Sequence, residues 1–228
     1  MKKRLSYIIL CFVIPTVVLS GALIFKEKQY AWISLCVTVL SCVPFFLHFE
    51  HSENDVRRLT IIAVMVAISV IGRFIFAPIP GFKPVTATVV ITAMYFGSEA
   101  GFMTGALSAV ISNFYFGQGP WTPFQMFVWG FIGFFAGVVL RKSKKPNKIA
   151  MSLMGVIGGV LFSLMMDIWT TLSLDGTFLW TRYLASIAAS FPIMTIYAVS
   201  NVIFLLILAR PFLEKLNRIK IKYGVFDS

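Results

Sequence analysis

Charge is scarce in this sequence. Only 13% of its 228 residues are Asp, Glu, Lys or Arg, whereas 58% are hydrophobic and the mean hydropathy is +0.87. Soluble domains carry about a quarter charged residues. No polar stretch of the chain exceeds about ten residues. These figures exclude an ordinary soluble protein and predict an integral membrane protein without an attached soluble domain.

Residues that support catalysis are also few. The only histidines, His48 and His51, stand at the edge of an apolar run, so a membrane serine hydrolase would have no histidine base inside its helix bundle. The phosphate-binding pattern G-x-x-x-x-G-K-[ST] does not occur, which excludes ATP hydrolysis by that route. The two histidines lie beside Glu50 and Glu53, and this pattern favours a charged surface turn over a metal site. We therefore expect no enzyme activity, no metal and no cofactor.

Cysteine is rare as well. No two cysteines have C-x-x-C spacing, and all three fall within apolar runs: Cys11, Cys36 and Cys42. This placement favours buried thiols over a disulfide or a metal-binding set.

Long apolar runs are what the sequence does contain. None alternates as a strand would, so they predict eight α-helices, at approximately 5–25, 29–48, 59–77, 84–97, 99–116, 122–140, 149–173 and 182–209. A helix needs about 20 residues to cross the hydrocarbon core of a bilayer. The run 84–97 is too short for this, so we expect it to tilt, to lie inside the bundle or to line a cavity. The fold class is an all-α integral membrane protein.

A mixed-charge segment at 50–58 divides the chain. We interpret 1–49 as a two-helix transmembrane extension, 50–58 as a cytoplasmic linker, 59–210 as a six-helix core and 211–228 as a basic cytoplasmic tail. With the N-terminus inside, 15 of the 20 Lys and Arg residues lie on the inner side. Because basic residues mark the cytoplasmic side, we expect a multi-pass protein of the cell membrane with both termini cytoplasmic.

Polar residues within or beside the apolar runs indicate a site. An ionisable group at a helix centre costs about 2.5–3.5 kcal/mol unless it is paired or faces water. Arg73 and Asp167 lie roughly 6 and 9 Å from the outer ends of their runs at about 1.5 Å per residue. Other polar residues share that outer layer or the loops above it, and together they form the candidate substrate site: Arg73, Lys83, Asn113, Gln118, Trp121, Gln125 and Asp167.

Two interpretations of this layer remain open. One is a structural Arg73–Asp167 ion pair capped by amides, and the other is an aromatic-lined cavity for a small molecule, open to the outside. In the second case the loops 78–83 and 117–123 would form lids. Pro120 and Pro123 end one helix and start the next, and they place Trp121 at a membrane boundary or against a planar ligand.

Several sequence segments in the core resemble one family. They are Ala-Val-Met-Val-Ala at 63–67, Gly-Phe-Lys-Pro-Val-Thr-Ala at 81–87, Phe-Gly-Ser-Glu-Ala-Gly-Phe-Met-Thr-Gly at 96–105, and Ser-Asn at 112–113 running into Gly-Gln-Gly-Pro-Trp-Thr-Pro-Phe-Gln-Met at 117–126. With them, the chain from about 59 to 209 resembles the substrate-binding S components of energy-coupling factor (ECF) vitamin transporters, most closely the cobalamin-type ones.

The resemblance implies a function. An S component captures a vitamin on the outer face, here with cobalamin as the first expectation, and docks through an Ala-x-x-x-Ala face, here Ala63 and Ala67. Its partners would be a membrane coupling protein and two ATPase subunits. The alternatives are an S component for another vitamin such as riboflavin or a thiamine precursor, a proton-coupled carrier or channel that uses Arg73 and Asp167, and a scaffold subunit without a ligand.

Overall fold

The computed structural model describes residues 42, 55–140 and 147–223, and all of the regular structure in this part of the chain is helical. The helices are α4 (Asp55–Ile75), α5 (Val85–Phe96), α6 (Ser98–Phe116), α7 (Trp121–Leu140), α8 (Lys148–Asp175) and α9 (Trp180–Tyr223). These six confirm the predicted core helices. The first two predicted helices, 5–25 and 29–48, lie outside the described residues except for Cys42, which is buried against Phe102, Ala106 and Phe134.

Three helices are long and apolar enough to cross a membrane, within the ranges that the structure describes. They span Trp121–Leu140, Lys148–Asp175 and Trp180–Leu216, and two shorter apolar helices lie at Leu59–Ile75 and Val85–Phe96. Many of their outward side chains are large and apolar, as expected for helices in contact with lipid. The protein is an all-α membrane protein.

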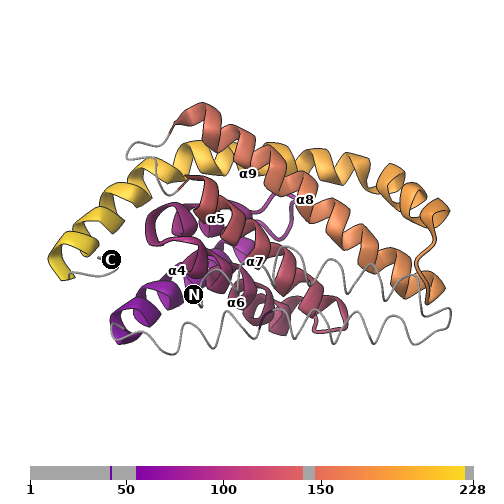
Figure 1. Ribbon diagram of the computed structural model, residues 1–228, viewed down its shortest axis with the longest axis horizontal. Coiled ribbons are helices and arrows are strands. Elements are labelled where there is room, and N and C mark those ends of the chain that lie inside the picture. The colour runs from indigo at the N-terminus through magenta and orange to yellow at the C-terminus, as the bar shows by residue number, and fades with distance from the viewer. Residues whose placement is uncertain (1–41, 43–54, 141–146, 224–228) are drawn as a thin grey trace, which may run out of the picture.

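The short helix α5 occupies the centre of the molecule. It has 12 residues, of which all but Tyr95 are buried. It packs against α4, α6, α7, α8 and α9. Figure 1 shows it between the α8–α9 pair on one side and α4, α6 and α7 on the other. The expectation that this segment sits inside the bundle is confirmed, and its length, about 18 Å at about 1.5 Å per residue, explains why it cannot span the membrane by itself.

Glycines set the closest helix contacts. A Cβ added at Gly133 on α7 would lie 2.4 Å from the carbonyl carbon and oxygen of Gly101 on α6. In the α8–α9 pair, a Cβ at Gly159 would lie 2.6 Å from the backbone nitrogen of Ala198. Small residues four apart therefore bring backbones together in both helix pairs, as predicted for packing within the bundle.

The last helix is longer than the sequence suggested. The apolar pattern predicted an end near 209, before Pro211, but α9 continues through Pro211 to Tyr223. Proline removes one backbone hydrogen bond without making helical backbone angles impossible. Leu216 is buried, and Phe212 and Leu213 pack against the core, so side-chain contacts after the proline hold this segment in the helix. The predicted helix end was therefore wrong.

Candidate functional site

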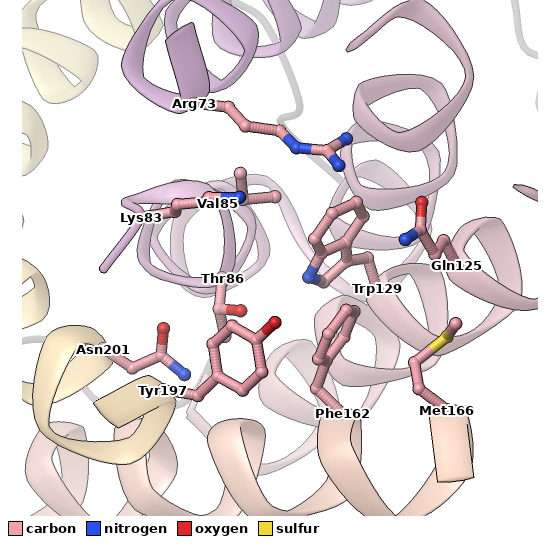
Figure 2. A pocket seen from close by; sticks show the side chains of 10 residues that line it. All are labelled: Arg73, Lys83, Val85, Thr86, Gln125, Trp129, Phe162, Met166, Tyr197 and Asn201. Atoms are coloured by element: carbon pink, nitrogen blue, oxygen red, sulfur yellow. The ribbon is translucent and has the colours of Figure 1, made fainter. Parts of the chain in front are cut away.

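A cavity of about 170 Å³ lies beside the start of α5 (Figure 2). Its walls come from α4, from the connection between α4 and α5, and from α5, α7, α8 and α9. The lining residues are Arg73, Lys83, Val85, Thr86, Gln125, Trp129, Phe162, Met166, Tyr197 and Asn201. The short helix thus begins at a hollow that the longer helices enclose.

Three aromatic side chains from three helices form one wall. The ring of Trp129 on α7 stacks on that of Phe162 on α8, with centroids 5.0 Å apart and planes at 19°. Phe162 meets Tyr197 of α9 edge to face at 5.2 Å. Figure 2 shows the Trp129 indole nitrogen and the Tyr197 hydroxyl directed toward the same open space. Such a wall suits a planar apolar ligand that also carries hydrogen-bond acceptors.

Arg73 is the most deeply buried cation of the site. Its side chain is 7% exposed, and Nη1 donates hydrogen bonds to the Ser112 hydroxyl and, at 2.9 Å, to Asn113 Oδ1. The guanidinium carbon lies 4.5 Å from the centre of the Phe116 ring and 5.2 Å from that of Trp129. Its Nε has no hydrogen-bond partner within the described part of the chain. The guanidinium is therefore fixed in position but keeps an unused donor.

Asn113 connects Arg73 to the start of α7. Its Nδ2 donates to Thr122 Oγ1 at 2.9 Å and to Gln125 Oε1 at 2.8 Å. The Thr122 hydroxyl in turn donates to Gln118 Oε1 at 2.9 Å. This network of hydrogen bonds joins α4, α6, α7 and the connection between α6 and α7, so the position of Arg73 is coupled to that of the connection.

Lys83 stands at the end of the α4–α5 connection. Its backbone N–H donates to Ser200 Oγ of α9 at 3.0 Å. Phe76 and Phe82 of the same connection pack against Phe204 of α9. Burial, and secondly the charge of Arg73, lower the pKa of the Lys83 amine below its ordinary value. The two cations thus lie close enough for their charges to interact.

The structure places four of the seven predicted site residues together. Arg73, Lys83 and Gln125 line the cavity, and Asn113 binds both Arg73 and Gln125. Gln118 and Trp121 lie outside its lining. Trp121 is 37% exposed, and a Cβ at Gly119 would lie 2.4 Å from its ring.

Asp167 faces a different neighbour. Its Oδ2 accepts a hydrogen bond from Ser190 Oγ of α9 at 2.6 Å, and the adjacent Met166, rather than Asp167, lines the cavity. Because Arg73 binds Ser112 and Asn113 instead, the alternative of a structural Arg73–Asp167 ion pair is wrong. The depth of the two groups in the membrane was similar, but depth does not fix the side of the helix on which each group lies.

Most of the cavity wall escaped the sequence analysis. Phe162 and Met166 are large apolar residues that a sequence does not distinguish from ordinary core residues. Tyr197 and Asn201 gave a usable signal, because two polar side chains four residues apart in an apolar helix share one face. No group of three or more His, Cys, Asp or Glu side chains in the described ranges could hold a metal.

The predicted docking residues lie away from this cavity. Ala63 and Ala67 are exposed on α4. They share that exposure with Val64 and Ile71.

The fold and the cavity together define a class, that of polytopic membrane proteins with a polar and aromatic cavity between helices. The family model described as "ECF-type riboflavin transporter, S component" matches residues 53–218, more than two thirds of the chain. The chain therefore belongs to this family of S components, which are non-enzymatic subunits of ECF-type transporters. No curated protein and no solved structure gave a significant match to the chain.

The Asn113 network yields a first prediction. Replacing Asn113→Leu removes the acceptor of one Arg73 hydrogen bond and the donor to Gln125, which leaves buried polar groups unpaired. We expect the free energy of unfolding, measured by denaturant titration in detergent micelles, to fall by about 1–3 kcal/mol. Thr195→Leu is the control, because Thr195 is exposed on α9 outside this network and its loss should change the value by about 0.5 kcal/mol or less. Equal losses in the two variants would show that Asn113 is not the centre of the network.

Proposed function

We propose that this chain is the substrate-binding subunit for riboflavin, or a close flavin relative, in an ECF-type importer. The observation that carries the proposal is the aromatic wall of Trp129, Phe162 and Tyr197 beside a set of unused hydrogen-bond donors. Flavins have a flat tricyclic ring with carbonyl oxygens and ring nitrogens along its polar edge. A stacking surface that faces donors suits that combination.

The donors can be named. The Trp129 indole N–H and the hydroxyls of Thr86 and Tyr197 line the cavity without a hydrogen-bond partner among the residues that the structure describes. Arg73 adds a cation to this lining. A site whose polar groups are hydrogen-bond donors discriminates against ligands that lack acceptors, because its buried donors would then remain unpaired.

The size of the cavity argues for a ligand smaller than cobalamin. Small-molecule sites commonly measure about 300–1,000 Å³, whereas this cavity measures about 170 Å³. A flavin therefore needs the walls to move apart, and a corrin ring would need far more. The family match does not support the cobalamin expectation either.

We propose the α4–α5 connection as the part that moves. The connection contacts α9 through the Lys83 backbone, which binds the Ser200 hydroxyl, and through the rings of Phe76 and Phe82, which pack against Phe204. Loops and aromatic contacts rearrange more easily than the backbone-to-backbone packing of α6 with α7. The cavity would open on the outer face, with both termini cytoplasmic and residues 1–49 as a two-helix extension.

Two other functions have less support. A proton-coupled carrier would use Arg73 and Asp167 together, but Asp167 binds Ser190 and does not line the cavity. A scaffold without a ligand would have no reason to keep unused donors in an aromatic cavity. The family instead favours delivery of the vitamin through a membrane coupling protein and two ATPase subunits.

Tryptophan substitutions test the proposed site. Flavin fluorescence quenching on titration with the purified chain in detergent should show saturable riboflavin binding. Trp129→Leu removes the stacking surface, and we expect the Kd to rise by about tenfold or more, which equals about 1.4 kcal/mol. Trp121→Leu is the matched control and should stay within about twofold, because Trp121 lies outside the cavity lining. A larger effect of Trp121→Leu would move the site to the α6–α7 connection.

The proposed docking face has its own test. Ala67→Leu adds bulk to the exposed small-residue face of α4, where close approach of a partner helix needs small side chains. We expect co-purification with the coupling protein and its ATPases to fall while riboflavin binding by the isolated chain persists. The control is Ala188→Leu, the same gain of bulk at an exposed position of α9. Riboflavin uptake into vesicles without any ATPase partner would contradict the proposal and support the carrier.

A further inference from the structure

One end of the cavity concentrates positive charge. Arg73 and Lys83 both line it, and the guanidinium of Arg73 and the amine of Lys83 lie 4.5 and 5.5 Å from the centre of the same Phe116 ring. Figure 2 shows the two side chains on the same side of the cavity, opposite Met166 and Asn201. Arg73 is 7% exposed, and its Nε has no partner in the described part of the protein. The lining thus carries two positive charges at one end of the cavity.

The start of α5 adds to this positive end. The first hydrogen bond of the helix joins the Thr88 N–H to the Pro84 carbonyl, so the N–H groups of the residues just before Thr88 lack partners within the helix. The N-cap makes no side-chain hydrogen bond and the first turn contains no acidic residue. Val85 and Thr86 of this turn line the cavity. A helix N-terminus carries a partial positive charge that favours an anion.

No acidic side chain in the described lining balances the positive charge of Arg73 and Lys83. No carboxylate lines the cavity within the described ranges, and Phe116 offers only its ring face to the two cations. Asp167 accepts its hydrogen bond from Ser190, and Asp175 pairs with Arg182 at 2.9 Å. Unpaired cations at membrane depth are unfavourable, and they usually mark the position of a ligand's opposite charge.

We propose that the end of the cavity formed by Arg73, Lys83 and the start of α5 is an anion subsite, which takes a phosphate group carried by the flavin. This inference rests on the proposed flavin capture and refines it. The ligand would place its ring along Trp129 and Phe162 and its phosphate against the two cations. Phosphorylated flavins would then bind in preference to riboflavin, which has no charged group to place there.

The test compares two ligands on the same protein. Riboflavin and riboflavin 5′-phosphate are titrated against the full-length chain, and the ratio of their Kd values is the readout, because an inactive fraction of protein cancels in the ratio. We expect the phosphate ester to bind about tenfold tighter or more. In Lys83→Gln the ratio should fall toward one. Lys215→Gln, an exposed lysine on α9, is the matched control and should keep the wild-type ratio.

The possible outcomes distinguish failure of the anion subsite from failure of the proposed function. Riboflavin binding with an equal or weaker affinity for the phosphate ester overturns the anion subsite and leaves the proposed function standing. Absence of binding by both flavins overturns the function and the subsite together.

A competition arm with inorganic phosphate identifies the source of the anion. If free phosphate weakens binding of the ester more than that of riboflavin, the subsite is supported and also accepts a free ion.

Discussion

The enclosure of α5 is the constraint on which the rest of the structure depends. With 12 residues it is too short to cross a bilayer, so its polar ends would meet hydrocarbon unless other helices covered them. Five helices of the described part of the chain pack against it, and the hollow at its first turn is where the aromatic wall and the cations meet. The site exists because a short helix leaves space that longer neighbours enclose. A helix long enough to span the membrane would fill that space.

The hydrogen bonds of Arg73 hold a positive charge in a fixed position at this hollow. An arginine within a membrane bundle needs partners, and Ser112 and Asn113 supply neutral ones instead of a carboxylate. Its positive charge is therefore held in place without being cancelled. Asn113 extends the same network to Gln125, so α4, α6 and α7 fix one another around the cavity. This arrangement fits a protein that binds and releases a ligand without changing it chemically.

The sequence predicted the helices well and the site only in part. Apolar runs and turn residues placed the ends of the six core helices to within a few residues, except for the C-terminal end of α9, because the bilayer imposes a simple length rule. The apolar pattern was a poor guide to the end of α9, where buried side chains beyond Pro211 kept the chain helical. Among site residues, polar groups such as Arg73 and Gln125 were predictable because they are rare in apolar runs. Phe162 was not, because whether a residue lines the cavity depends on its position around the helix axis, and for the same reason Asp167 lies outside the lining.

A structure determined with riboflavin bound to the full-length chain tests the central claim most directly. The account predicts that the flavin ring lies against Trp129 and Phe162, with its acceptor edge toward Thr86 and Tyr197 and with the α4–α5 connection displaced to make room. A flavin bound between α8 and α9 beside Asp167 and Ser190, or on the connection between α6 and α7, would contradict it.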